Sequence, residues 1–243
     1  MEDLRDLVKE LEKAEGWENK IKKLQDINKA LVTQYVIRVG DLTIEPLWVE
    51  AYYYDKESFP DCNTHMNDKQ KGHCRFGKLY LHAKTEINGG VDICLSEKDD
   101  YYLSFLIKAS LIEGEFCKQQ KACGLINQLP MEKEDIEEIK NVLVKKEMKK
   151  EKDCKVVKAA RVGLTKPCFY GQQLAACTVK DLDILEKNGF DFPDGYKKQW
   201  KYSVCALSEI DDEDEARARA KEKNGAKIEN KYWNLAKESL GIE

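Results

Sequence analysis

One short stretch combines strong strand signals with a lone charge, and it constrains the fold more than any other part of the chain. Residues 47–55 are rich in aromatic and β-branched side chains and follow a turn signal at Gly40-Asp41, which predicts a β-strand. Alternation with a period of two puts Glu50 on one face with Trp48, Tyr52 and Tyr54, and puts Leu47, Val49, Ala51 and Tyr53 on the other. Glu50 is therefore either solvated on the wet face of an edge strand or held among rings and compensated there.

Two further stretches that we predict to be core strands each contain a single charge. Residues 79–84 and 91–95 alternate on either side of a glycine turn and predict a hairpin, whose second strand contains Asp92. The apolar run 101–112 has Lys108 as its only charge. Buried ionisable residues are uncommon unless they are paired or functional. The charges therefore predict either an ion pair that stabilises the sheet, such as Asp92 with Lys108, or a shared site that also includes the strand 47–55.

The remaining periodicity predicts one α+β domain over residues 1–243, in which helices cover a curved, mixed or antiparallel sheet. Residues 1–33 carry two amphipathic stripes that break at Gly16, so they predict an N-terminal helical cover. A further strand, at 35–39, precedes the Gly40-Asp41 turn. Later in the chain we predict helices at 131–152 and 171–189, strands at 156–164 and 200–207, and an acidic segment plus a helix at 211–243.

The bulk composition is that of a soluble globular protein. Charged residues make up 35% and hydrophobic residues 42% of the chain, and no apolar run reaches the roughly 18 residues that a membrane span needs. The N-terminus is acidic and lacks the apolar core of a secretory signal. The nine cysteines include no C-x-x-C pair. We therefore expect a cytoplasmic, monomeric protein that does not associate with membranes and keeps its thiols reduced.

The net charge of −4 argues against a protein that coats nucleic acid through its overall field. Positive charge is nevertheless concentrated in one region, at Lys145, Lys146, Lys149, Lys150, Lys152, Lys155, Lys158 and Arg161. Such a run is either a solvated helix face or a surface that contacts phosphates.

Metal and thiol chemistry find little support in the sequence. Cys62 and His65, followed by His73 and Cys74, invite a zinc site, but two adjacent ligands have poor geometry for one ion, and a loop can hold such residues by chance. Cys62 or Cys94 is a conceivable nucleophile, yet nothing in the sequence places either at a helix N-terminus or beside a fixed positive charge. No glycine-rich phosphate loop occurs. We therefore expect neither a metal nor another cofactor.

A third kind of chemistry uses a carboxylate base among aromatic rings. A flat heteroaromatic base stacks between rings and imidazoles, and the carboxylate activates a water molecule against the carbon next to that base. The side chains that supply these groups are Glu50, Tyr52, His65 and His82.

Several segments follow one another in the order that is found in one known family. These are Ala30-Leu31-Val32, 35–39, Trp48-Val49-Glu50-Ala51-Tyr52, His65, Gly77-Lys78-Leu79-Tyr80-Leu81-His82, the Gly89-Gly90 turn, Asp92-Ile93 and Leu106-Ile107-Lys108-Ala109. Through them, residues 26–112 resemble the alkyladenine DNA glycosylases, also called methylpurine-DNA glycosylases, as a divergent member. The spacing from Gly77 to Asp92 is nearly that of the family.

The resemblance implies a monofunctional DNA N-glycosylase of base excision repair, a hydrolase without a metal requirement. Glu50 matches the general base that activates water, and Lys108 matches an arginine beside that water and the DNA backbone. Asp92 matches a pocket asparagine that helps to reject normal guanine. The residues that match the stacking and hydrogen-bonding walls of the pocket for the flipped base are Tyr52, His65 and His82.

Some positions depart from the family pattern. Asp92 and Lys108 replace an asparagine and an arginine, which fits a compensating pair, and His82 replaces a tyrosine, which adds a protonatable group. Thr85 stands where the family has the tyrosine wedge that fills the gap left by the flipped base, and Ile87 is the alternative wedge. Without a wedge, single-stranded or unusually modified DNA becomes the expected substrate. A catalytically silent nucleic-acid-binding relative and an unrelated α+β interaction protein are the alternative functions.

Overall fold

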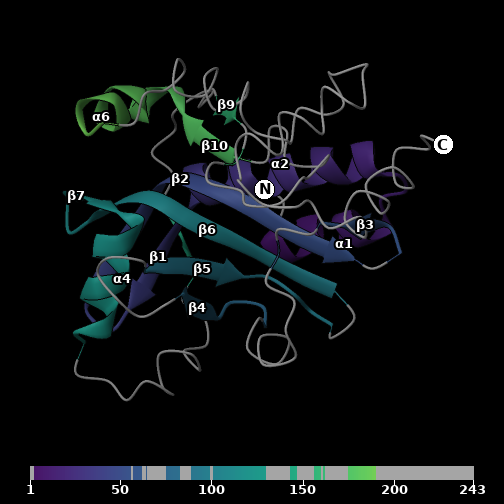
Figure 1. Ribbon diagram of the computed structural model, residues 1–243, viewed down its shortest axis with the longest axis horizontal. Helices are drawn as coiled ribbons and strands as arrows, with labels where there is room; N and C mark the ends of the chain where they lie inside the picture. Colours follow the sequence, from purple (N-terminus) through teal and green to yellow (C-terminus); the bar gives the residue numbers. More distant parts are fainter. Residues whose placement is uncertain are drawn as a thin grey trace, which may run out of the picture.

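A curled β-sheet runs through the part of the chain that the computed structural model describes (Figure 1). This part comprises residues 3–55, 57–61, 64, 75–82, 89–98, 101–129, 143–146, 156–159, 161 and 175–189. Its strands are β1 (Tyr35–Val39), β2 (Leu42–Asp55), β3 (Phe59–Pro60), β4 (Leu79–His82), β5 (Gly90–Cys94), β6 (Tyr101–Ile112), β7 (Glu115–Lys118), β8 (Leu143–Lys145), β9 (Val156–Ala159) and β10 (Ala175–Thr178). Its helices are α1 (Leu4–Lys13), α2 (Trp17–Gln34), α4 (Gln119–Asn127), the short 3-10 helix η1 (Val179–Asp181) and α6 (Leu182–Lys187).

The long strands β2 and β6 form the centre of this sheet and lie side by side across Figure 1. On one side β6 pairs with β5, and β5 pairs with β4. The other edge of β2 pairs in turn with β1, β10 and β3, and β1 pairs with β8. All these pairings are antiparallel, so an α+β fold built on a curved antiparallel sheet, as the sequence predicts, is confirmed.

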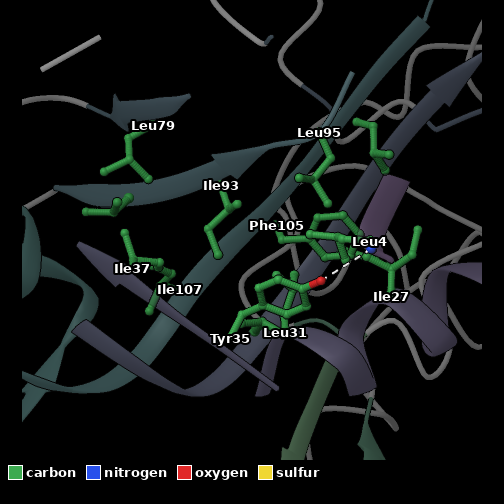
Figure 2. Close-up of a cluster of buried hydrophobic side chains, with 14 of the residues drawn as sticks. Leu4, Ile27, Leu31, Tyr35, Ile37, Leu79, Ile93, Leu95, Phe105 and Ile107 are labelled. Carbon is green, nitrogen blue, oxygen red and sulfur yellow. Dashed lines mark hydrogen bonds between the residues drawn. The ribbon is translucent and has the colours of Figure 1, made fainter. Parts of the chain in front are cut away.

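One face of the sheet packs against α1, α2 and α4 and forms the main hydrophobic core. Figure 2 shows how Leu4, Ile27 and Leu31 of the helices meet strand residues such as Phe105 and Ile107. The helix α1 places its apolar residues on one stripe (Leu4, Leu7, Val8 and Leu11), and all of them are buried. The Tyr35 hydroxyl accepts a hydrogen bond of 3.3 Å from the Leu4 backbone N–H, which ties α1 to β1.

The predicted N-terminal helical cover is confirmed as the pair α1 and α2, separated at Gly16, whose φ is +74°. No helix in the described ranges has the combination of length and apolar character that a membrane span needs. The cysteines at 94, 117, 123 and 177 are all buried and reduced.

Two predictions for the second half of the chain are wrong. Within the predicted helix 131–152, residues 143–145 form β8, which pairs with β1. The predicted helix 171–189 is wrong over residues 175–178, which form β10, and is confirmed only from η1 and α6 onward, over residues 179–187. The predicted strand 156–164 is confirmed over its first four residues, as β9. The strand at 200–207 and the acidic segment and helix at 211–243 lie outside the described residues.

Candidate functional site

The second face of the sheet, opposite the main core, gathers polar and aromatic side chains from neighbouring strands. On β2 the alternation sends Val49, Ala51 and Tyr53 into the main core, so Glu50 and Tyr52 project to the other side. Cross-strand register extends this face, because Tyr52 lies opposite Ser104, and Asp92 lies opposite Leu106, the partner of Glu50. Tyr54, Tyr80 and Tyr102 pack with Cys94 on the same face. The charges at 50 and 92 therefore meet on one surface of the sheet.

A β-bulge places Lys108 beside this surface. Val49 of β2 lies opposite Ile107 of β6. The preceding residue, Trp48, lies opposite Ala109, so β6 has one residue more than β2 between these pairs, and that residue is Lys108. A bulge interrupts the alternation and re-aims a side chain, and such irregularities are enriched next to active sites.

A second bulge corrects one predicted facing. Pro46 lies opposite Ser110, and the next pair along β2 is Trp48 with Ala109, so Leu47 is the extra residue on β2. Leu47 packs with Trp48 in a second hydrophobic cluster rather than with the core-facing residues of β2. The predicted alternation was therefore wrong at Leu47, because the register shift breaks the period of two.

Glu50 is fully buried, and Lys108 and Tyr52 are among the described residues that contact it. The Lys108 ammonium lies 3.9 Å from Glu50 Oε2, and the lysine side chain is 16% exposed. The Tyr52 hydroxyl donates a hydrogen bond of 3.1 Å to the same oxygen. A buried carboxylate needs such compensation, since an isolated one loses its hydration without replacement. The hypothesis that Glu50 is solvated on a wet sheet face is wrong for this structure.

Tyr52 is hydrogen-bonded to Glu50 and lies within the electrostatic reach of Asp92. Burial raises the pKa of Tyr52 well above its usual value, and the negative charges of Glu50 and Asp92 raise it further, while Arg161 opposes this. The phenol therefore keeps its proton at neutral pH and acts as a donor toward Glu50.

Asp92 is 2% exposed and takes its hydrogen bonds from hydroxyls. Ser104 donates to its Oδ2 at 3.0 Å, and the Tyr102 hydroxyl donates to the same oxygen at 3.4 Å. The ion pair of Lys108 in the described part of the chain is with Glu50, whereas the sequence-based example of a pair joined Asp92 to Lys108. Both carboxylates and the lysine thus belong to one polar cluster, in which hydroxyls hold Asp92 and the cation faces Glu50.

A second buried ion pair, which the sequence did not predict, adjoins this cluster. Arg161 and Asp61 are both fully buried, and Arg161 Nη1 donates to Asp61 Oδ2 at 2.6 Å. The Arg161 guanidinium carbon also lies 4.6 Å from the centre of the Tyr52 ring. The interpretation of Arg161 as part of a solvated or phosphate-contacting basic run is therefore wrong. A weaker signal existed, because Arg161 lies in the mostly apolar run 156–164, which also contains Lys158.

Several predicted site residues lie outside what the structure describes. His65, Thr85 and Ile87 fall in undescribed segments, as do Cys62, His73 and Cys74 of the conceivable zinc site. Only the backbone of His82 is described, at the end of β4. Among the described residues there is no group of three or more side chains suited to hold a metal ion. Cys94, a conceivable nucleophile, is buried on β5 among tyrosine rings.

The described part of the site combines a buried carboxylate, a cation, a phenol that donates a hydrogen bond, and tyrosine rings. A carboxylate in such surroundings is the type of group that serves as a general base, and rings offer stacking surfaces for a flat group. No protein-family model matches this chain, and no curated protein matches it either.

Proposed function

We propose that this chain is a DNA N-glycosylase that hydrolyses the bond between deoxyribose and an alkylated or otherwise modified base, with Glu50 as general base. The observation that carries the proposal is the fully buried Glu50 carboxylate, with Lys108 at 3.9 Å and the Tyr52 hydroxyl at 3.1 Å. A purely structural carboxylate gains little from burial on a sheet face, because its desolvation is costly. A base for water needs this dry, oriented environment.

The chemical step follows from these groups. Glu50 accepts a proton from a water molecule as the water oxygen bonds to the anomeric carbon of the sugar. The bond from that carbon to the base nitrogen breaks, and its electron pair leaves with the base. A base that is cationic through alkylation departs as a neutral molecule, so it needs little help from an acid. Lys108 places a positive charge beside the Glu50 carboxylate, and Tyr52 holds the carboxylate by its hydrogen bond.

The protein must also take the target base out of the duplex stack, or act on a single strand, before this step. In this proposal Tyr52, His65 and His82 wall the pocket, Asp92 reads the base edge, and Ile87 or Thr85 occupies the position of the wedge. DNA is the partner, no cofactor takes part, and the protein acts as a cytoplasmic monomer.

Glu50→Gln tests the proposal. The amide keeps the shape of the side chain but cannot accept the proton, so release of modified purines from methylated DNA should fall to the background rate, while DNA affinity stays within about tenfold. Mass spectrometry of the free bases measures the release, and a filter or gel assay measures the affinity. The matched control is Glu115→Gln, which changes an exposed glutamate on β7 and should leave release unchanged.

Each alternative function predicts a different result. A catalytically silent nucleic-acid-binding relative binds DNA but releases no base, with or without Glu50. An unrelated interaction protein does neither, and Glu50→Gln, Asp92→Asn and Lys108→Met then alter only its thermal stability. Undiminished release by Glu50→Gln in an active preparation refutes the role of Glu50.

A further inference from the structure

The buried ion pair of Asp61 and Arg161 contacts β2, the strand that contains Glu50. The two residues are 100 positions apart in the chain, and each has a side chain that is fully removed from solvent. Asp61 directly follows β3, and its carbonyl oxygen accepts hydrogen bonds from the Thr64 N–H at 3.3 Å and from the Thr64 hydroxyl at 2.8 Å. Asp61 is thus itself fixed, so it can hold the guanidinium in one orientation.

Arg161 contacts the two residues that follow Glu50 on β2. Its Nη1 donates a hydrogen bond of 3.2 Å to the Ala51 carbonyl oxygen, and its guanidinium carbon lies 4.6 Å from the centre of the Tyr52 ring. A planar guanidinium that is held by a carboxylate and lies over a ring restricts both the position and the tilt of that ring. The Tyr52 hydroxyl in turn donates to Glu50 at 3.1 Å.

A purely stabilising role accounts poorly for this pair. Two buried charges lose their hydration, and well-packed apolar residues of similar volume often stabilise a protein as much or more. Lys20 of α2, another buried cation beside a tyrosine ring of β2, offers a contrast. Its ammonium lies 5.5 Å from the centre of the Tyr53 ring, on the opposite face of β2, and it makes no contact with Glu50 in the described structure.

We propose that Arg161, oriented by Asp61, is a positioning residue: it fixes Tyr52, and through Tyr52 it fixes the Glu50 carboxylate. The catalytic consequence rests on the function proposed above. Arg161 itself touches neither water nor substrate in this scheme, so its removal should slow the chemical step and leave substrate binding nearly unchanged.

The test removes both charges together, because Arg161→Met alone leaves Asp61 buried without its cation and risks a failure to fold. The variants are Asp61→Asn/Arg161→Met, Tyr52→Phe, and the two combined, each checked for cooperative thermal unfolding. Single-turnover release of modified base gives the rate, and its dependence on DNA concentration gives the KM. A crystal structure of the pair variant gives the distance between the Tyr52 hydroxyl and Glu50.

We expect the pair variant and Tyr52→Phe each to lower the rate about tenfold with KM within about twofold, and the combined variant to be no slower than Tyr52→Phe within about threefold. Lys20→Met, the matched loss of a buried cation from a ring on β2, should leave the rate unchanged. A pair variant with an unchanged rate overturns the inference, and so does a combined variant whose losses multiply.

The structural measurement separates this inference from the proposed function. If the wild-type protein releases no base, the proposed function fails, and the distance then decides the inference alone. A Tyr52 hydroxyl that has left Glu50 in the pair variant supports the positioning role. A hydrogen bond that remains near 3.1 Å overturns it.

Discussion

Glu50 and Lys108 are the residues on which the proposed chemistry depends most directly, and their contact is long for an ion pair. At 3.9 Å the ammonium is near enough to interact favourably with the carboxylate. The lysine side chain is 16% exposed, so the pair is only partly screened by solvent. In the proposed function, Lys108 is the counter-charge of Glu50.

Lys108→Met should slow base release at neutral pH by about tenfold, because the buried Glu50 carboxylate loses the positive charge that lies 3.9 Å from it. Single-turnover release rates at one pH check this. Lys108→Arg should keep the wild-type rate, and Lys118→Met, at an exposed lysine on β7, serves as control. An unchanged rate in Lys108→Met contradicts the counter-charge role.

The sequence predicted part of this site for a physical reason. A single charge in an apolar run is visible in the sequence without knowledge of how the strands pair, so Glu50, Asp92 and Lys108 could be predicted as site residues. The structure brings all three into one polar cluster. The pairing itself was not predictable, because it depends on a bulge that shifts the register of β2 against β6. Asp61 was missed because it lies in a short polar segment, where a carboxylate is unremarkable.

At the scale of elements, local pattern and tertiary pairing disagree in the second half of the chain. The predicted helix 131–152 contains Val142-Leu143-Val144, a run of apolar and mostly β-branched residues that fits a strand as well as a helix, and pairing with β1 selects the strand. The strand β10 is short and entirely buried, and it pairs with β2 and β9. Four small residues, three of them apolar, carry no periodicity of their own, so the neighbouring strands determine their conformation.

The connection between α1 and α2 was predictable because Gly16 determines it. Its φ of +74° and ψ of +150° lie in a region that essentially only glycine adopts. A Cβ at this position meets nothing within 4 Å. Gly16→Ala should therefore lower the free energy of unfolding by about 1–3 kcal/mol through backbone strain alone.

Denaturant unfolding of Gly16→Ala measures this cost. The neighbouring change Glu15→Ala, at an exposed residue, should alter stability by less than about 0.5 kcal/mol. Since the sheet face that carries Glu50 is not involved, base release by Gly16→Ala should remain at the wild-type rate at temperatures where the protein is folded. An unchanged stability means that the turn relaxes to an ordinary conformation.

At the scale of the whole molecule, the two faces of the sheet differ in the side chains that they carry. The face that packs against α1, α2 and α4 is apolar and accounts for most of the hydrophobic burial. The other face carries the polar cluster, and beside it lies the second hydrophobic cluster, where β10 and α6 pack on Trp48. Cys177 lies in that second cluster and is fully buried, so its ionisation requires the molecule to open.

The burial of Cys177 should make the free energy of unfolding decrease at alkaline pH. Burial raises the pKa of the Cys177 thiol from 9.0 to about 12, with a smaller contribution from Asp181. The folded state thus holds this proton more tightly than the unfolded chain, and the free energy of unfolding should fall as pH rises from about 9 to about 12. The slope from one such group is at most about 1.4 kcal/mol per pH unit, or about 4 kcal/mol over three units.

Cys177→Val keeps most of the side-chain volume and cannot ionise, so its stability should fall less steeply than that of the wild type in this window. Thermal or urea unfolding from pH 7 to 10.5 compares the slopes; the absolute level below pH 8 reports only repacking. The slope that remains in the variant belongs to groups such as Cys117, Tyr52 and Tyr101, whose pKa values burial also raises. Identical slopes for the wild type and Cys177→Val mean that the thiol ionises without opening of the cluster that β10 and α6 form on Trp48.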